Sequence, residues 1–380
     1  MKVVLHDNNK WLKFAPLTLT RPVGNLRIGI LTNDERWRFL LPHVEVGFVT
    51  EDYLSGKFSP NDGIIMNACV ILNREIADAI TLLEDNSELH DGNDWIARRG
   101  DGSQKVNFSG NSISISERWH LYQLNGEALK SDFQLITEGR MSEPLSTTNI
   151  VIGDPDLIFL EEGAQVEGAI LNTTNGPIYV GTNAEIMEGS VVRGPLAMNP
   201  SSALKLGAKV YGPTTLGPHC KVGGEVNNCI FQSFSNKGHD GFLGNSLIGE
   251  WCNLGADTNS SNLKNNYGMV KTYSFESKQI EQTDVQFMGL VMGDHSKCGI
   301  NTMFNTATVI GVCSNLFGAE FPPKYVPSFQ WGVNGESYRF DRALESAENM
   351  MERRGAQLSL HDIDILQFIS DKSNGFSGNN

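Results

Sequence analysis

The chain has 380 residues, of which 40% are hydrophobic, and its formal net charge is −14. So acidic a chain lacks the basic surface that nucleic-acid binding normally requires, and no run of eighteen apolar residues predicts a membrane span. Six cysteines without a CxxC spacing predict reduced thiols and no zinc site. The stretch "MKVVLHDNNKW" also lacks the features of a secretory signal. We therefore expect a cytoplasmic protein that binds neither nucleic acid nor membranes.

The first part of the chain, residues 1–145, predicts an α/β domain. Strands alternating with helices indicate a layered arrangement of this kind. The expected strands are short apolar runs at 2–6, 44–50 and 62–72, and the expected helices have amphipathic leucine and isoleucine spacing at 73–85 and 124–139.

From residue 146 to 320 apolar residues recur at every sixth position, which is the period of neither a helix nor a strand. Small residues such as Ala184, Ser190 and Cys252 often follow four positions later. Short strands that point one apolar residue inward and then turn over a small residue build a triangular β-solenoid, whose turns contact only their neighbours. We expect loops where the period breaks, at 172–179, 228–241 and 259–287. The apolar positions include Leu160, Val166, Val180, Ile186, Val192, Met198, Leu204, Val210, Leu216, Val222, Phe242, Ile248 and Leu254.

The last part, residues 321–380, begins with the proline-rich segment "EFPPKYVPSFQWG" and continues with two helical patterns. These patterns cover residues 341–354 and 358–372, and Ser359 is placed to cap the second. An open solenoid end exposes unpaired strand edges. We expect the helices either to cap that end or to form an oligomer contact.

Three stretches resemble the GlmU family. "KGHDGFLGNSLIGEWCNLGADT", at 237–258, is similar to the acetyltransferase region of the bifunctional GlmU enzymes, which make UDP-N-acetylglucosamine from glucosamine-1-phosphate, acetyl-CoA and UTP. "TRPVGNLRIGILTNDERW" and "MGDHSKCGINTMFNTATVIG" resemble a divergent GlmU-like branch of Bacteroidetes-type bacteria. The resemblance implies a reduced, Rossmann-like nucleotidyltransferase domain followed by a left-handed parallel β-helix. It also implies a homotrimer that uses acetyl-CoA and a sugar phosphate.

Acetyl transfer to an amine needs a base, and a histidine titrates near neutral pH. The resemblance assigns this role to His239; the alternative is a histidine on a surface loop. A base needs an orienting partner. Glu225 stands where the family carries a glutamate, and Asp257, eighteen positions after His239, is a second candidate if each turn has eighteen residues.

Further residues receive ligand-binding roles. Lysines on the solenoid are candidates for holding the acceptor phosphate, although Phe242 and Asn227 replace a tyrosine and a lysine that bind the acceptor in the family. Solvated lysines and an internal asparagine ladder are the structural alternatives. The resemblance implies Asn253 and Asn262 for the sugar and acetyl group, and Lys271, Gly299, Ile300 and Gly318 for coenzyme A; the candidate phosphate-binding lysines are Lys209, Lys221 and Lys237.

The first domain resembles nucleotidyltransferases less completely. In the segment "FAPLTLTRPVGNLRIG" the candidate nucleotide-binding residues are Thr20, Arg21, Gly24 and Arg27, because arginine pairs with phosphate through two hydrogen bonds. The glycine-rich loop of the family is missing, and Asn67 stands where an aspartate would hold Mg²⁺. We therefore expect a degenerate domain, and Mg²⁺ only if it is active.

The main functional hypothesis is an acetyl-CoA-dependent N-acetyltransferase of amino-sugar phosphates. The first alternative is a sugar-1-phosphate nucleotidyltransferase that uses UTP or dTTP, with the solenoid as an assembly domain. The second is a protein that binds sugar nucleotides without turnover.

Overall fold

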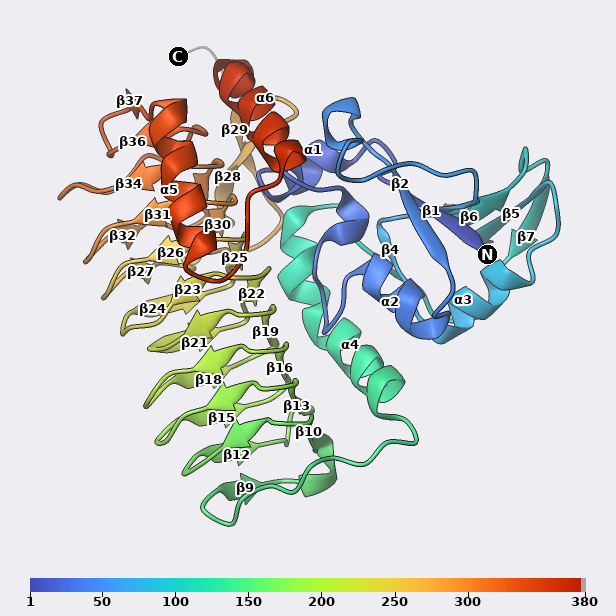
Figure 1. Cartoon of the computed structure of the whole chain (residues 1–380), viewed down its shortest axis with the longest axis horizontal. Coiled ribbons are helices and arrows are strands. Elements are labelled where there is room, and N and C mark those ends of the chain that lie inside the picture. The colour runs from blue at the N-terminus through green and yellow to red at the C-terminus, as the bar shows by residue number, and fades with distance from the viewer. Residues whose placement is uncertain (377–380) are drawn as a thin grey trace.

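The structure is a computed structural model that describes residues 1–376. An α/β domain lies beside a long coil of short strands, and two helices follow at the C-terminal end (Figure 1). The predicted fold class is therefore confirmed. None of the described helices has the length and apolar composition needed to span a membrane.

The α/β domain is built on a six-stranded mixed sheet with the order β2-β1-β3-β6-β5-β7. β1 pairs in parallel with β2 and β3, whereas β6 is antiparallel to β3. The strands are β1 (Lys2–His6), β2 (Glu45–Val49), β3 (Ile64–Asn67), β5 (Ser87–Asp91), β6 (Asp94–Arg99) and β7 (Gln104–Asn107), and β4 (Val70–Ile71) pairs with β8 (Ile113–Ser114).

Four helices belong to this domain: α1 (Trp11–Phe14), α2 (Asn33–Leu40), α3 (Arg74–Thr81) and α4 (Arg118–Thr137). The side chain of Thr32 and that of Glu35 form a capping box that starts α2. α4 begins six residues before the helix expected at 124–139 and ends two residues before the expected end, at Thr137; it lies between the domain and the coil (Figure 1). Its Asn125 accepts a hydrogen bond from the backbone of Gly29 and donates to the carbonyl of Pro213, so this helix joins the two parts.

The coil consists of three parallel sheets, and the chain visits them in turn. Sheet I contains β10 (Ile158–Leu160), β13 (Ile178–Val180), β16 (Leu196–Met198), β19 (Thr214–Leu216), β22 (Ile230–Phe231), β25 (Leu247–Ile248), β30 (Val291–Met292), β33 (Val309–Ile310) and β35 (Tyr325–Val326). Sheet II contains β11 (Gln165–Val166), β14 (Glu185–Ile186), β17 (Ala203–Leu204), β20 (Lys221–Val222), β23 (Asn236–Lys237), β26 (Asn253–Leu254), β31 (Lys297–Cys298), β34 (Asn315–Leu316), β36 (Gln330–Trp331) and β37 (Glu336–Ser337). Sheet III contains β9 (Ile150–Ile152), β12 (Ile170–Asn172), β15 (Val191–Arg193), β18 (Lys209–Tyr211), β21 (Glu225–Asn227), β24 (Phe242–Gly244), β27 (Asn259–Ser260) and β32 (Met303–Phe304).

Pairing along sheet I explains the six-residue period. Leu160 pairs with Val180, Val180 with Met198, and Met198 with Leu216. These side chains are at most 3% exposed, so each stacks on its counterpart one turn away inside the prism. Apolar burial repeated in every turn is what stabilises a solenoid.

The coil differs from expectation in two places. Residues 228–241, expected to form a loop, instead supply β22 and β23, and the turn is merely shortened, because Lys221 pairs with Asn236. The coil also continues past the expected boundary at 320, since β35 and β36 join sheets I and II. The loop expected at 259–287 is found from residue 261 onward, because β27 still belongs to sheet III, and it includes the hairpin of β28 (Lys271–Ser274) and β29 (Gln279–Gln282).

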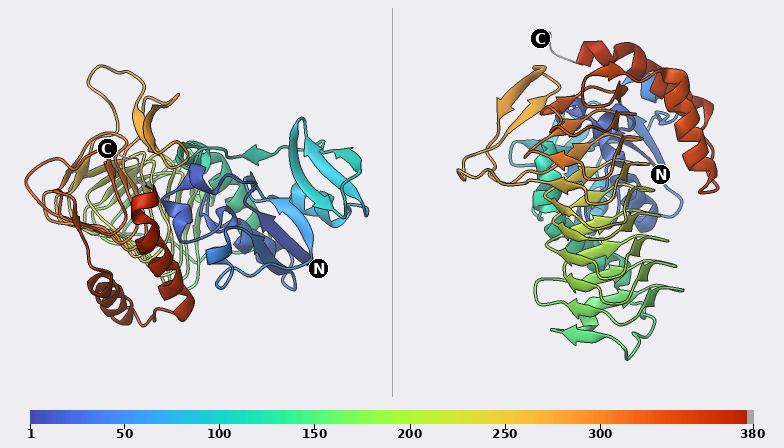
Figure 2. Two further views of the ribbon diagram at one scale, coloured as in Figure 1. Left: turned by 90° about the horizontal axis from the view of Figure 1, so that it is seen from above. Right: turned by 90° about the vertical axis from the view of Figure 1, so that its left-hand side faces the viewer.

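The C-terminal helices are α5 (Phe340–Glu352) and α6 (Leu360–Phe376). They lie on one side of the coil, away from the β28–β29 hairpin, and the α/β domain lies on another side (Figure 2). α6 contacts the α/β domain through the ion pair of Lys57 with Asp362, at 2.7 Å, and through the stacked rings of Tyr53 and Phe368. The helices therefore tie the end of the coil back to the first domain.

Candidate functional site

His239 lies at the corner where the coil passes from sheet II to sheet III, and its side chain is exposed. Asn236 pairs with Asn253, and Asn253 pairs with Lys297. Three positions after Asn236, Asn253 and Lys297 come His239, Ala256 and Ile300. These three residues therefore lie above one another in successive turns. The backbone N–H of Asn301, the residue after Ile300, donates a hydrogen bond of 2.8 Å to the carbonyl of Ala256, so these two turns are joined at the corner.

A pocket of about 420 Å³ opens beside His239. We call it the histidine pocket. Asn253 and Ile300 also line it, and so do three cationic side chains, Lys205, Lys221 and Arg354. The pocket thus brings together four of the predicted residues, His239, Asn253, Ile300 and Lys221, within a cluster of positive charge, in a chain that is strongly acidic as a whole.

Arg354 follows the end of α5 and reaches the pocket from outside the coil. Its Nη2 donates a hydrogen bond of 3.0 Å to Oδ1 of Asn236. The pKa of Lys221 is lowered, mainly by the positive charge of Arg354 and further by partial burial. Mutual repulsion of this kind is relieved when an anion binds among the cations. Sequence reasoning missed Arg354, because nothing in the helical pattern of α5 indicates that its end contacts sheet II.

Lys237 is not available to a substrate. Its side chain is buried, and Nζ donates hydrogen bonds to the carbonyls of His239, at 2.7 Å, and Asp240, at 3.1 Å. Burial lowers the pKa of Lys237 to about 8. The residue therefore holds the corner that carries His239 and does not face the acceptor, contrary to prediction.

The two candidate partners of His239 are placed differently. Asp257 stacks on Asp240, since its N–H donates to that carbonyl at 3.0 Å; this turn has seventeen residues, so the expected position above His239 belongs to Ala256. Glu225 starts β21, and its Oε1 accepts a hydrogen bond of 2.7 Å from the hydroxyl of Tyr211. The carbonyl of His239 packs against Gly224, the residue before Glu225. Glu225 is thus near the corner, although its observed partner is Tyr211.

The other predicted ligand-binding residues are scattered. Lys209 points outward from sheet III, where it pairs with Glu225. Asn262 lies at a different corner of the prism and donates to Asn245 at 2.7 Å. Lys271 is on the β28–β29 hairpin, and none of these three lines the histidine pocket. Gly318 lies in the same column as His239 and Ile300, one turn after Ile300. Gly299 lies in the neighbouring column, which also contains Gly238 and Gly255.

The candidate nucleotide-binding residues are occupied by contacts between the domains. Arg21 is buried; its Nη1 lies 2.9 Å from Glu250, and its Nη2 pairs with Asp294. The hydroxyl of Thr20 donates to the same Asp294. Both acids belong to the coil, so these two residues fasten the domains together and do not line a phosphate site as predicted.

Arg27 and Gly24 are also committed. Arg27 forms a double hydrogen bond with Glu35, and its backbone N–H donates to the side chain of Gln232 in the coil. A side chain at Gly24 would come within 2.7 Å of Leu5, which shows that this glycine permits close packing in the core. Asn67 bonds the backbone of Trp95 and of Cys69, and the described residues contain no cluster of three or more acidic, histidine or cysteine side chains able to hold a metal.

Comparison with known proteins finds similarity over parts of the chain. Residues 3–141 match the family model described as a sugar nucleotidyl transferase. The chain is 34% identical over 87 residues to the bifunctional protein GlmU of Methanocaldococcus jannaschii. That match covers 23% of this chain and 21% of the relative, so it spans about a fifth of the relative's length. Among solved structures, the polySia specific acetyltransferase NeuO aligns with a TM-score of 0.27 and 10% identity, over 48% of this chain and 77% of that one.

Residues 3–141 therefore resemble a sugar nucleotidyl transferase domain, and part of the chain resembles a bifunctional GlmU protein. More particularly, the sugar nucleotidyl transferase domain and the GlmU similarity confirm the resemblance to the GlmU-like family. Membership of one divergent branch stays a prediction.

Proposed function

We propose that the chain transfers an acetyl group from acetyl-CoA to the amine of an amino-sugar phosphate such as glucosamine-1-phosphate. The observation that carries this proposal is the histidine pocket, in which His239 and Asn253 share a cavity with Lys205, Lys221 and Arg354. A potential general base beside a cluster of cations suits an amine substrate that carries phosphate.

In the proposed reaction the imidazole of His239 takes a proton from the attacking amine. The amine nitrogen forms a bond to the thioester carbonyl carbon, the carbon–sulfur bond breaks, and the coenzyme A thiolate leaves and is protonated. The amide of Asn253 supplies a donor and an acceptor for the sugar or the acetyl group. Lys205, Lys221 and Arg354 hold phosphate groups. Gly299 and the glycines that precede it in the same column, Gly238 and Gly255, let the pantetheine arm approach the backbone.

Glu225 is proposed as a positioning residue for His239. Its Oε1 accepts from Tyr211, which leaves Oε2 for a second partner. The corner of His239 is anchored from the inside by Lys237. In this proposal the exposed ring of His239 turns toward the carboxylate of Glu225. Substitution of each residue tests this role of Glu225, the sugar-binding role of Asn262, the phosphate-binding role of Lys209 and the coenzyme A-binding roles of Lys271 and Gly318.

The assay follows thiol release from acetyl-CoA in the presence of glucosamine-1-phosphate. We expect activity in the native chain and a loss of a hundredfold or more in His239→Ala, the scale of losing a general base. The matched control is His43→Ala, which removes another exposed histidine, from the α/β domain. An unchanged rate in His239→Ala would remove the base assignment. Absence of thiol release with hexosamine phosphates would reject the acetyltransferase proposal.

Nucleotidyl transfer is the second candidate, supported by the family match over residues 3–141. Because Arg21 and Arg27 are bound to acidic side chains, another part of the domain would have to hold the triphosphate. The test is pyrophosphate release from UTP or dTTP with a sugar-1-phosphate and Mg²⁺. Ligand binding without turnover in either assay would favour the third hypothesis, a binding protein.

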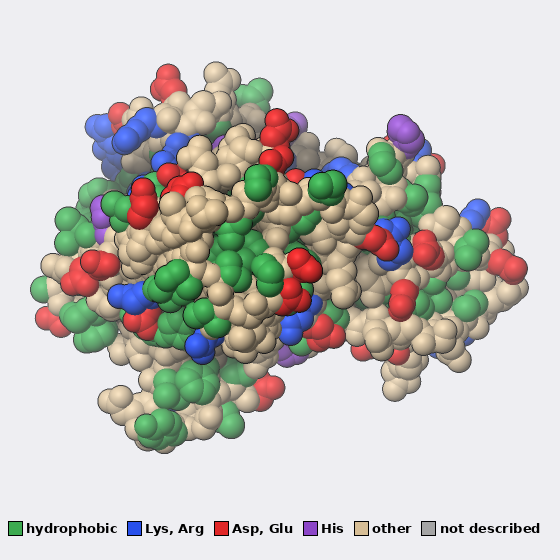
Figure 3. All heavy atoms as spheres, turned by 90° about the horizontal axis from the view of Figure 1, so that it is seen from below, with side chains coloured by type: hydrophobic (Ala, Val, Ile, Leu, Met, Phe, Trp, Pro, Cys, Tyr) green, Lys and Arg blue, Asp and Glu red, His purple; other side chains and the backbone are tan. Residues whose placement is uncertain are grey.

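We also propose a cytoplasmic homotrimer. All six cysteines are free and buried, in keeping with a reducing compartment. Sheet III carries exposed apolar side chains, among them Ile150, Ile152 and Val191, and hydrophobic groups gather at the surface of the coil seen from the β9 end (Figure 3). Such a face suits a contact between subunits. Light scattering coupled to size exclusion should give three chains per particle; a monomer at micromolar concentration would contradict this.

A further inference from the structure

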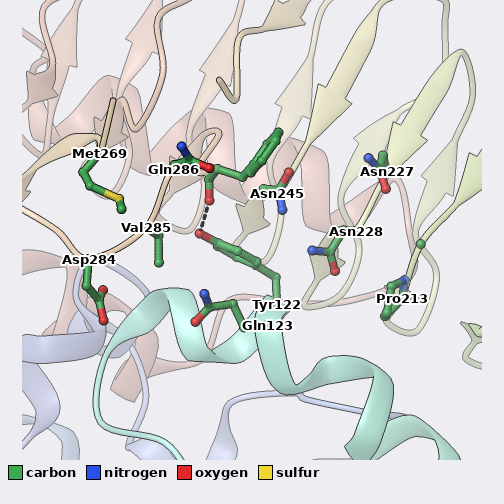
Figure 4. A pocket seen from close by; sticks show the side chains of 12 residues that line it. Tyr122, Gln123, Pro213, Asn227, Asn228, Asn245, Met269, Asp284, Val285 and Gln286 are labelled. Carbon is green, nitrogen blue, oxygen red and sulfur yellow. Dashed lines mark hydrogen bonds between the residues drawn. The ribbon is translucent and has the colours of Figure 1, made fainter. Parts of the chain in front are cut away.

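A second pocket, of about 520 Å³, lies at the junction of the two domains and shares no lining residue with the histidine pocket. We call it the junction pocket. Its walls come from α4, from the corner where sheet III turns into sheet I, and from the loop 261–287 (Figure 4). Five of the residues that line it carry side-chain amides: Gln123, Asn227, Asn228, Asn245 and Gln286.

Part of this lining is a fixed frame. The amide of Asn228, in the orientation that satisfies its neighbours, donates to the carbonyls of Tyr122 and Pro213 and accepts from Asn245. The hydroxyl of Tyr122 donates to the carbonyl of Phe287 at 2.7 Å (Figure 4). These bonds connect the coil, α4 and the loop 261–287, so the pocket is held in shape before any ligand enters.

Three other polar side chains of the pocket are uncommitted. Gln123, Asn227 and Asp284 form no side-chain hydrogen bond with any described residue, although each lines the cavity. Together they offer two amides, each with donors and an acceptor, and one carboxylate that only accepts. Unmatched polar groups that converge on one preformed cavity indicate a ligand with its own donors and acceptors.

The charge of the pocket narrows the class of ligand. No lysine, arginine or histidine lines the junction pocket, and Asp284 supplies its one carboxylate. A phosphate or carboxylate would meet no cation here and would be repelled by Asp284. The histidine pocket shows the opposite composition, with three cations and no acid. Hydroxyl groups, which both donate and accept, match amides and a carboxylate well.

We propose that the junction pocket binds an uncharged sugar, through the free side chains of Gln123, Asn227 and Asp284. Phe287, which also lines the cavity and is 46% exposed, offers an apolar surface for the carbon-bound hydrogens of a sugar ring. The volume lies within the range of small-molecule sites and is ample for a monosaccharide. This site is separate from the proposed acetyl transfer and does not rest on it.

The test is saturation-transfer NMR on the full chain with methyl β-glucopyranoside and methyl N-acetyl-β-glucosaminide, each at millimolar concentration. We expect transfer to at least one of them. Gln123→Leu and Asn227→Leu should each weaken that binding about tenfold, because each removes a hydrogen-bonding partner from a polar ligand. The matched control is Gln134→Leu, which makes the same change at an exposed position of α4 outside the pocket.

Two results with the neutral sugars would overturn the proposal. One is an absence of transfer to both neutral sugars in the native chain. The other is binding that Gln123→Leu and Asn227→Leu leave unchanged, which would place the sugar elsewhere. Glucose-1-phosphate serves as the anionic comparison: weaker binding than that of the neutral sugars supports the proposed class, whereas stronger binding that the two variants abolish rejects it. Thiol release from acetyl-CoA, measured separately, keeps this test independent of the proposed activity.

Discussion

The guanidinium of Arg21 lies 2.9 Å from the carboxylate of Glu250 and pairs at the same time with Asp294, so one residue of the α/β domain contacts two acids of the coil. All three side chains are largely or fully buried. Although burial opposes it, the charge of Arg21 lowers the pKa of Glu250 to about 2, whereas burial raises the pKa of Asp294.

This cluster predicts a large effect of Arg21→Ala on stability. Removing the cation leaves two acids without their partner, and breaking a buried pair costs about 3–5 kcal/mol. We expect the unfolding midpoint in urea to fall accordingly. The triple variant Arg21→Met, Glu250→Gln, Asp294→Asn should recover most of the loss, because no unpaired charge remains. An unchanged midpoint in Arg21→Ala would show that the cluster does not hold the domains together.

Asp7 predicts a dependence of stability on pH. Its carboxylate is 4% exposed, and burial raises its pKa to about 7, despite hydrogen bonds from Thr50 and the backbone of Val23. The folded state therefore binds more protons than the unfolded state between about pH 4 and 7, so this group's contribution is lost as pH rises through that window. From pH 5 to pH 8 the loss is on the order of 2–3 kcal/mol.

The variant Asp7→Asn removes this titration and should become more stable relative to the native chain as pH rises. Urea unfolding at pH 5, 6, 7 and 8 measures the difference. Asp94→Asn, at an exposed position of β6, provides the control and should show no such trend. A constant difference between Asp7→Asn and the native chain across these pH values would contradict the prediction.

Arg354 predicts an effect on substrate affinity. If it holds a phosphate group in the histidine pocket, Arg354→Ala should raise KM about tenfold and change kcat little, as expected for lost uniform binding. Steady-state kinetics with acetyl-CoA and the sugar phosphate varied in turn will show which substrate it contacts. Arg342→Ala, which removes an exposed arginine from α5, the helix that precedes Arg354, is the control. A fall in kcat alone would instead indicate a role in positioning His239.

Lys237 predicts an effect on turnover. Lys237→Met removes both hydrogen bonds to the corner that carries His239, so we expect kcat to fall about tenfold while KM stays near the native value. Lys237→Gln keeps a donor and should restore part of the rate. Circular dichroism will establish that both variants are folded. Native kcat in Lys237→Met would show that the corner keeps its shape without this side chain.

Much of the coil follows from local sequence, because one inward side chain per strand imposes its period on the chain. Leu160, Val180 and Met198 stack as their spacing predicts. The six-residue period does not predict the buried residues where a turn is shortened. Phe231 and Lys237 are buried in the coil although they do not lie on this repeat. A one-residue difference in turn length also moves Asp257 from His239 to Asp240.

The sequence by itself determined the solenoid and the α/β domain, because these depend on burial patterns that repeat along neighbouring residues. Only the tertiary structure decided the use of the charged residues. An arginine that suits a phosphate suits a carboxylate equally well, and Arg21 meets Glu250 because the two domains pack against each other. Arg354 reaches Asn236 for the same reason, through a contact between segments far apart in the chain.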